Sequence, residues 1–153
     1  MTKIKKEKIS WQKADAMCAK LAAKVKRSFH PDLLIGISRG GLVPLRLLSD
    51  YLEVRELGVV GVKFYSAVGK TKGKPVVTQR LNVAVAGKKV LVVDDVADSG
   101  KTLALVVKML KKRGAKAVRS ATLHYKKSSI VKPDFYVKET RDWIVYPWEK
   151  QKN

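Results

Sequence analysis

The residues best suited to chemistry lie close together in the middle of the chain. Three carboxylates, Asp94, Asp95 and Asp98, follow the apolar run Val90-Leu91-Val92-Val93, and Ser99-Gly100-Lys101-Thr102 comes directly after them. Carboxylates at the carboxyl end of a buried strand are costly unless they bind something. A loop that enters a helix offers free backbone N–H groups to an anion. Carboxylates suit hydroxyls or a metal and amides suit a phosphate, so the stretch favours a sugar phosphate as its ligand.

Two other interpretations of this stretch were weighed. Ser99-Gly100-Lys101-Thr102 is similar to the end of a Walker A loop, whose first glycine would fall at position 95. That position is Asp95, whose charge would repel a triphosphate, so a nucleoside-triphosphatase is rejected. The second alternative is a surface loop in which Asp98 or Ser99 caps the next helix. Capping leaves the pair Asp94 and Asp95 without a reason.

The patterns around these residues predict the elements that position them. Buried apolar runs predict strands at 33–37, 57–65, 90–93 and 117–125. Apolar residues at helical spacing predict helices that begin after Ser10, near Leu42 and at Leu103. Strands that alternate with helices predict an α/β fold with a mostly parallel central sheet flanked by helices. Ligands of such sheets bind beyond the carboxyl ends of the strands.

A second polar loop follows an earlier strand. Ser38, Arg39, Gly40 and Gly41 separate the strand 33–37 from the next expected helix. Paired glycines let a backbone approach a ligand closely, and an arginine can bind phosphate oxygens with two parallel hydrogen bonds. Alone this signal is weak, but beside the aspartate stretch it indicates a second anion site at the same edge of the sheet.

These motifs together resemble one family. The run Asp94-Asp95-Val96-Ala97-Asp98-Ser99-Gly100-Lys101-Thr102 closely resembles the signature of the type I phosphoribosyltransferases, with Ser99 where threonine is commoner. Ser38-Arg39-Gly40-Gly41 looks like the pyrophosphate loop of the bacterial xanthine–guanine branch. Lys126 and the pair Trp143-Ile144 lie where the 6-oxopurine branch has its base-binding residues. The resemblance implies the type I phosphoribosyltransferase fold with a small C-terminal hood.

The resemblance also implies a reaction and its parts. A purine-salvage enzyme of this kind moves 5-phosphoribosyl from 5-phosphoribosyl 1-diphosphate (PRPP) to N9 of guanine, hypoxanthine or xanthine, releasing pyrophosphate with the help of Mg²⁺. Asp98 is the expected catalytic residue, Asp94 and Asp95 hold the ribose, and Asp95 is the metal candidate. By position, the resemblance implies that the 5′-phosphate is bound by Ala97, Asp98, Ser99, Gly100, Lys101 and Thr102. It implies that the pyrophosphate is bound by Ser38, Arg39 and Gly40, and the purine by Lys126, Trp143 and Ile144. Tyr65 and Ser66 are the expected residues of a lid over the site.

The lysine and the tryptophan bear on the choice of base. An ammonium group donates hydrogen bonds and cannot accept them, so Lys126 would select a 6-oxo group over a 6-amino group, and Trp143 would stack on the purine. An adenine or pyrimidine phosphoribosyltransferase is the alternative within the enzyme class. A non-catalytic regulator on the same fold, binding a nucleotide or RNA, is the alternative outside it.

Composition limits the remaining possibilities. The 153 residues are expected to form a single domain, 1–153, with a core at about 31–125 and a hood at about 126–150. The 33 Lys and Arg outnumber 13 Asp and Glu, a net charge of +20, which suits steering of an anionic substrate. Because the lysines are spread over the whole chain, a nucleic-acid partner is not expected.

Several smaller expectations concern the surroundings of the site. The single cysteine, Cys18, excludes an internal disulfide and suits the cytoplasm, and no signal peptide or membrane partner is expected. The basic arm at residues 3–8 is expected to be a solvated tail, and residues 81–83 a strand. Trp148 is expected to fix the C-terminus to the core. Family members usually associate, so a homo-oligomer is expected.

Overall fold

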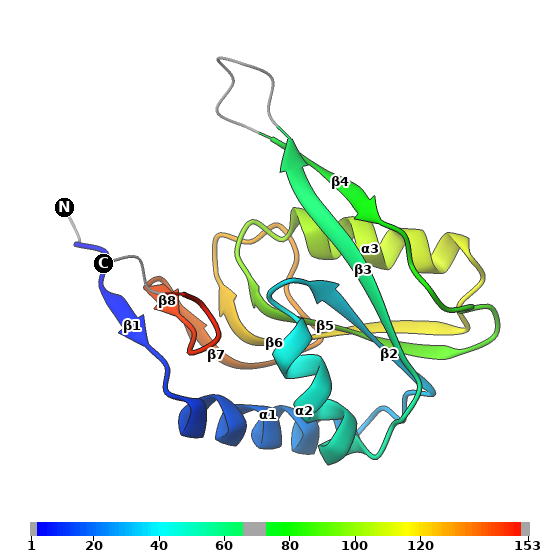
Figure 1. Cartoon of the computed structure of the whole chain (residues 1–153), viewed down its shortest axis with the longest axis horizontal. Helices are drawn as coiled ribbons and strands as arrows, with labels where there is room; N and C mark the ends of the chain where they lie inside the picture. Colours follow the sequence, from blue (N-terminus) through cyan, green and yellow to red (C-terminus); the bar gives the residue numbers. More distant parts are fainter. Residues whose placement is uncertain (1–2, 66–72, 151–153) are drawn as a thin grey trace.

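Strands and helices alternate through most of the chain. The computed structural model describes residues 3–65 and 73–150, and in this part six strands form one sheet in the order β4-β3-β2-β5-β6-β7 (Figure 1). All neighbouring pairs are parallel except β3 and β4, so the predicted mostly parallel sheet is confirmed. The elements are β1 Lys6–Lys8, α1 Trp11–Lys26, β2 Leu33–Ser38, α2 Leu42–Leu52, β3 Leu57–Tyr65, β4 Lys74–Gln79, β5 Lys89–Ala97, α3 Lys101–Lys112, β6 Ala117–Lys126, β7 Phe135–Thr140 and β8 Trp143–Val145.

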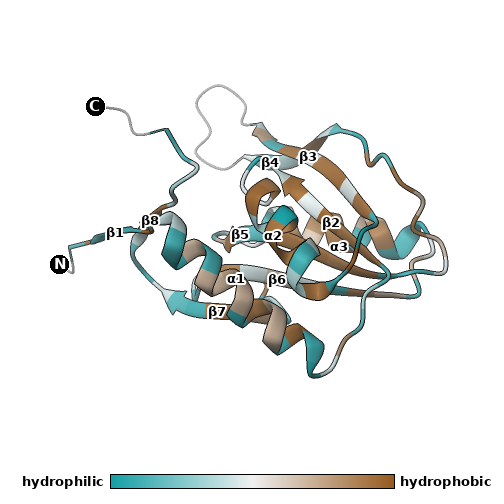
Figure 2. Ribbon diagram, turned by 60° about the horizontal axis from the view of Figure 1, so that its bottom comes forward, coloured by the Kyte–Doolittle hydropathy of each residue, from teal (hydrophilic) through white to brown (hydrophobic). Residues whose placement is uncertain are grey.

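The helices cover both faces of the sheet. α1 and α2 lie on one face and α3 on the other (Figure 1). Along β5, Leu91 and Val93 contact the α1–α2 side, while Val90 and Val92 contact the α3 side. Burial on both faces explains why this strand is apolar without alternation, and each such side chain stabilises the fold by about 1.5–3 kcal/mol. Figure 2 shows hydrophobic residues on the central strands and hydrophilic ones on the outward faces of the helices.

Helix α1 begins as the sequence predicts. The Ser10 hydroxyl accepts a hydrogen bond from the Lys13 N–H at 3.0 Å, and the apolar stripe of the helix is buried. Cys18 lies in that stripe, where burial raises the pKa of its thiol to about 12. This cysteine is therefore a core residue and not a nucleophile.

The central strand is longer than the sequence predicts. It does not end at Asp94 but continues to Ala97, because β6 remains beside it and pairs Asp94 with Thr122 and Ala97 with Tyr125. On its other side, the pairing with β2 ends at Val93. The sheet therefore divides at the aspartates, and the last residues of β5 have a strand neighbour on one side.

The N-terminal arm is not the solvated tail that its lysines suggest. β1 pairs in parallel with β8 and forms a separate two-stranded sheet, which makes the small hood (Figure 1). Glu7, inside the basic run, accepts from the ammonium groups of Lys13 at 2.9 Å and Lys138 at 3.0 Å. Main-chain pairing and these ion pairs hold the arm in place, so the prediction of a tail was wrong.

One predicted strand is absent and one predicted contact is present. Residues 81–83 do not form a strand, because the Asn82 side-chain oxygen accepts from the Val59 N–H at 3.1 Å in place of a main-chain partner. Trp148 lies against the core and stacks on Tyr146, with ring centroids 4.8 Å apart. Within the described ranges, no helix combines the length and apolar character needed to cross a membrane.

Candidate active site

The loop between β5 and α3 presents main-chain N–H groups toward open space. Gly100 occupies the N-cap of α3 with φ of 81°, and no side chain caps the helix. The capping interpretation of Asp98 therefore fails, although Ser99 Oγ accepts from the Lys101 N–H at 3.3 Å. A cavity of about 150 Å³ lies in front of these amides, lined by Phe64, Asp94, Val96, Ala97, Asp98, Ser99, Gly100, Thr102, Leu103 and Thr122. Such a site suits a phosphate group.

The two strand aspartates are desolvated; Asp94 lines this cavity, and Asp95 lies against the glycine loop after β2. Asp95 is 9% exposed and Asp94 is half-buried. Burial, and then the neighbouring charge of Asp95, raises the pKa of Asp94 well above its usual range, and burial likewise raises the pKa of Asp95. Two adjacent buried carboxylates need a cation or hydroxyl donors to stabilise their charge. A metal ion would supply the first and a ribose would supply the second.

The glycine loop after β2 approaches these carboxylates closely. A Cβ on Gly40 would lie 2.5 Å from Asp95 Oδ2, and a Cβ on Gly41 would lie 2.5 Å from the Val93 carbonyl oxygen. Only glycine permits this approach. Ser38 donates to Gln79 Oε1 at 3.2 Å, and exposed Arg39 borders a cavity of about 620 Å³ together with Lys63. The loop in which the sequence predicts a second anion site therefore lies directly beside Asp95.

Three side chains from separate parts of the chain come together near the loop after β5: Asp98, Lys126 and Trp143. Lys126, at the end of β6, places its ammonium nitrogen 3.4 Å from Asp98 Oδ1 and 5.4 Å from the centre of the Trp143 ring. The Lys126 side chain is 16% exposed and Trp143 is 54% exposed. Asp98 and Lys126 also line a cavity of about 820 Å³, together with Lys3, Ile4, Lys5, Lys127, Ser128, Thr140, Arg141 and Asp142. An open aromatic face, a cation and a carboxylate suit a flat, polar base.

Comparison with known proteins identifies the family of this constellation. The phosphoribosyl transferase domain matches residues 9–151. The chain belongs to this family. Among curated relatives, the xanthine-guanine phosphoribosyltransferase of Cereibacter sphaeroides is 32% identical over 118 residues, covering 76% of this chain and 68% of the relative. That of Gluconobacter oxydans is 31% identical over 144 residues, covering 92% and 83%.

Solved structures give the same result. A purine phosphoribosyltransferase from Pyrococcus horikoshii Ot3 is 40% identical with a TM-score of 0.87, covering 98% of this chain and 97% of that one. A Neisseria gonorrhoeae protein with bound ppGpp is 28% identical with a TM-score of 0.86, covering 98% and 92%. The type I phosphoribosyltransferase fold, expected from the aspartate signature, is confirmed.

Not every residue expected in a phosphoribosyltransferase site lies in the cavities. Ile144 is buried in the core, so only its main chain remains available to a base. Tyr65 is 59% exposed at the end of β3, while its neighbour Phe64 lines the cavity in front of α3. Ser66, the other residue of the expected lid, lies outside the described residues.

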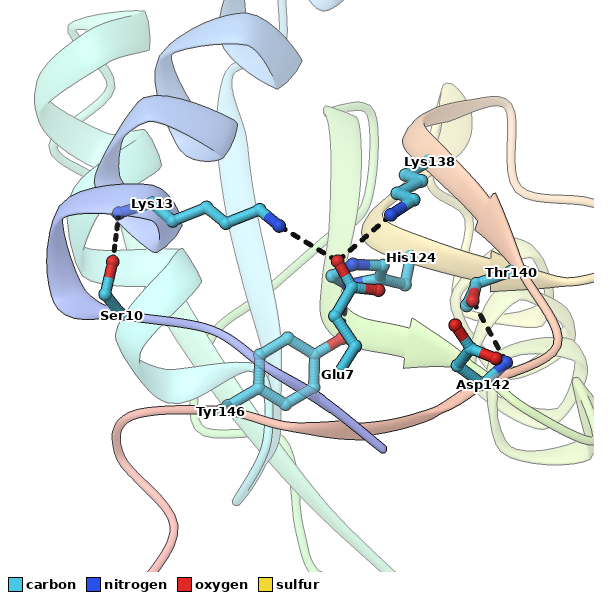
Figure 3. A network of polar contacts seen from close by, with 8 residues as sticks. All are labelled: Glu7, Ser10, Lys13, His124, Lys138, Thr140, Asp142 and Tyr146. Atoms are coloured by element: carbon cyan, nitrogen blue, oxygen red, sulfur yellow. Dashed lines mark hydrogen bonds and ion pairs between the residues drawn. The ribbon is translucent and has the colours of Figure 1, made fainter. Parts of the chain in front are cut away.

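Sequence reasoning missed a buried polar cluster behind the phosphoribosyltransferase site. Tyr146 donates its hydroxyl hydrogen to the Asp95 carbonyl oxygen at 3.0 Å. His124 Nδ1 lies 2.8 Å from the same hydroxyl, and Figure 3 shows these two side chains. Thr122, fully buried, borders the cavity beside Asp94. The polar residues that alternate along β6 were the one available signal, since a strand buried on both faces is otherwise apolar.

Proposed function

We propose that this chain transfers 5-phosphoribosyl from PRPP to N9 of a 6-oxopurine, giving a nucleoside monophosphate and pyrophosphate. The observation that carries the proposal is the meeting of Asp98, Lys126 and Trp143 beside two anion-binding loops. In the reaction, the bond between the ribose C1′ and the pyrophosphate oxygen breaks, and a bond from C1′ to N9 forms. The proton that the purine loses goes to a base on the enzyme.

The donor is held along the edge of the sheet. The amides at the start of α3, with the hydroxyls of Ser99 and Thr102, bind the 5′-phosphate. Asp94 and Asp95 accept hydrogen bonds from the ribose hydroxyls. Arg39 and the Gly40 main chain bind the pyrophosphate and stabilise the charge that develops on it as it leaves. The close approach of Gly40 to the Asp95 carboxylate supports this arrangement, because neighbouring groups of one donor molecule would need neighbouring partners.

The purine lies between the tryptophan and the loop aspartate. Lys126 donates to the 6-oxo group, Trp143 stacks on the ring, and Asp98 takes or shares the proton at N7. The distance of 3.4 Å between Lys126 and Asp98 supports this assignment, because one base can then contact both side chains. An adenine would present a donor to a donor at Lys126, which disfavours it.

The residues present suit Mg²⁺ only when the donor shares it. In the described part of the chain, no group of three or more His, Cys, Asp or Glu side chains gathers as a metal site. The adjacent carboxylates of Asp94 and Asp95 do fit the usual mode, in which Mg²⁺ is bound by one or two carboxylates together with substrate oxygens. When bound, the ion would neutralise charge on the leaving pyrophosphate.

The remaining expectations concern partners and place. The net charge of +20 supports steering of the anionic donor toward this edge. We propose that the protein acts in the cytoplasm as a homo-oligomer, as the resemblance implies. The exposed apolar residues Phe64 and Val76 on the β3–β4 hairpin support association, which light scattering on the purified protein would test.

One assay tests the function directly. Purified protein is incubated with PRPP, Mg²⁺ and guanine, hypoxanthine, xanthine or adenine in separate reactions, and nucleotide is measured by chromatography. We expect product with at least one 6-oxopurine and little or none with adenine. Absence of product from every 6-oxopurine would contradict the proposal, and product from adenine alone would favour the alternative base. Binding of RNA without any transfer would favour the non-catalytic regulator.

A further inference from the structure

The last residues of β5 need hydrogen-bond partners that the sheet does not supply. The pairing with β2 ends at Val93, so main-chain groups on that side of β5 have no strand partner beyond it, although β6 still pairs on the other side. Side chains supply the missing partners. Asp94 Oδ1 accepts from the Asp95 N–H at 2.8 Å, and Asp95 Oδ1 accepts from the Val96 N–H at 2.7 Å. The Asp95 carbonyl oxygen accepts from Tyr146 at 3.0 Å.

The Tyr146 hydroxyl is itself fixed on both sides. Its ring is 1% exposed and stacks on Trp148 with an angle of 6° between the planes. A phenol carries its proton at neutral pH, and this hydroxyl donates it to the Asp95 carbonyl oxygen. Since that single proton is used, His124 must donate to the hydroxyl from Nδ1, at 2.8 Å. The geometry therefore requires an imidazole that carries a hydrogen on Nδ1.

The surroundings of the imidazole favour its neutral form. His124 is fully buried, and burial lowers its pKa to about 4. Lys138 and Lys13 lower that pKa further, while Glu7, which accepts from both lysines, opposes them. Figure 3 shows the Glu7 carboxylate and the two lysine side chains beside the imidazole, with Tyr146 on the adjoining side.

We propose that Tyr146 and His124 are positioning residues of the donor site, which hold the main chain of Asp95 where β2 no longer does. The carboxylate of Asp95 lies against Gly40, so a shift of this main chain would move it relative to both the ribose and the pyrophosphate loop. The inference rests on the proposed function, because it concerns the orientation of a donor-binding carboxylate. Neither residue lines the cavities beside the aspartates.

The Tyr146→Phe variant removes the hydroxyl and keeps the ring. We expect the KM for PRPP, and the dissociation constant for Mg²⁺–PRPP measured by calorimetry without a base, to rise about tenfold, with the KM for guanine nearly unchanged. The control is Tyr136→Phe, since the Tyr136 hydroxyl makes no hydrogen bond among the described residues. Unchanged PRPP affinity, an equal rise in both KM values, or an equal effect of the control would overturn the proposal.

Two substitutions at His124 separate positioning from packing. Asn can place an N–H where Nδ1 lies, whereas Leu fills the space without a donor. We expect His124→Asn to keep PRPP affinity close to that of the wild type and His124→Leu to lose it about tenfold. Equal affinities for the two variants would contradict the role of the donor.

The tautomer provides a measurement independent of turnover. Nitrogen-15 spectra of histidine-labelled protein should show one imidazole, absent from His124→Asn, with its hydrogen on Nδ1 and no titration across neutral pH. A hydrogen on Nε2 would overturn the inferred chain of hydrogen bonds even if Tyr146→Phe does not fold. If the wild type forms no nucleotide, the proposed function fails, while calorimetry with Mg²⁺–PRPP and the spectra still decide the positioning role.

Discussion

The two carboxylates within β5 and the one carboxylate in the loop that follows it lie in opposite environments. Asp94 and Asp95 lie within β5, desolvated and fixed by hydrogen bonds to the following main-chain amides. Asp98 lies in the loop after the strand, where its side chain is 61% exposed and its partner is the Lys126 ammonium. The strand holds its carboxylates at a cost in stability, whereas the loop holds its carboxylate at almost none.

This difference matches what each proposed role requires. Carboxylates that bind ribose hydroxyls and a metal must stay in one place, and a strand with neighbours fixed around it provides that. A group that exchanges a proton with the base must reach the base and then solvent, which a loop position permits. The comparison predicts that a substitution at Asp94 will change both stability and PRPP binding, whereas a substitution at Asp98 will change turnover with little effect on stability.

The largest effect is expected from Asp98→Asn. The amide keeps the size of the side chain but cannot take the purine proton, so we expect turnover to fall by about a hundredfold to a thousandfold. Binding of the nucleoside monophosphate should remain largely intact, because the phosphate contacts come from the main chain of the loop. Steady-state kinetics and calorimetry measure the two quantities. Unchanged turnover would remove Asp98 from its proposed role.

The next effect concerns the partner of Asp98. Lys126→Ala removes the donor to the 6-oxo group, so we expect kcat/KM for a 6-oxopurine to fall roughly 10- to 100-fold, with a smaller change in PRPP binding. Lys112→Ala, which removes the same charge from the C-terminal turn of α3, is the control for steering. Equal losses in purine use and PRPP binding would argue against base selection by Lys126.

The features of this site that the sequence predicts are local. An apolar run followed by aspartates, a glycine and a helical pattern places β5, the loop and α3 in order, because strand and helix preferences act over neighbouring residues. The contact of Lys126 with Asp98 and Trp143 did not follow from any such pattern. The resemblance to the phosphoribosyltransferases implied only that Lys126 and Trp143 bind the purine and that Asp98 is catalytic, and the structure shows the contacts themselves.

The missed features all depend on pairing between distant segments. The strand character of Lys6–Lys8 arises from pairing with Trp143–Val145 at the other end of the chain, and a run of lysines gives no sign of it. The extension of β5 past Asp94 arises from β6. The bond from Tyr146 to the Asp95 carbonyl joins the hood to the central strand, so it could be seen only once both were in place.

A third prediction tests the cost of the strand carboxylates. Because burial and Asp95 raise the pKa of Asp94 in the folded state, the folded protein binds this proton more tightly than the unfolded chain, and stability falls as pH rises through the raised pKa. Asp94→Asn removes this cost and keeps an oxygen acceptor for the Asp95 N–H. At neutral pH we expect a gain of about 2 kcal/mol, or ~4–8 °C in Tm, together with loss of PRPP binding.

Thermal unfolding of the wild type and Asp94→Asn between acidic and neutral pH provides the measurement. The stability difference between them should grow as pH rises, since the wild-type carboxyls ionise and the amide does not. A variant less stable than the wild type at neutral pH would show that the Asp94 charge is compensated within the protein. The strand and loop carboxylates would then not differ in cost.

The smallest expected effect is the change in stability caused by Asp98→Asn. The ion pair of Asp98 with Lys126 spans 3.4 Å, but the Asp98 side chain is 61% exposed, and ion pairs of this kind contribute about 0–1 kcal/mol that salt weakens further. Asp98→Asn should therefore shift the Tm by ~2 °C or less, and by less still at high salt. The same thermal scans as for Asp94→Asn measure it. A rise in Tm as large as that of Asp94→Asn would mean that the loop carboxylate is as desolvated as the strand pair, and the assignment of proton exchange to the exposed position would lose its physical basis.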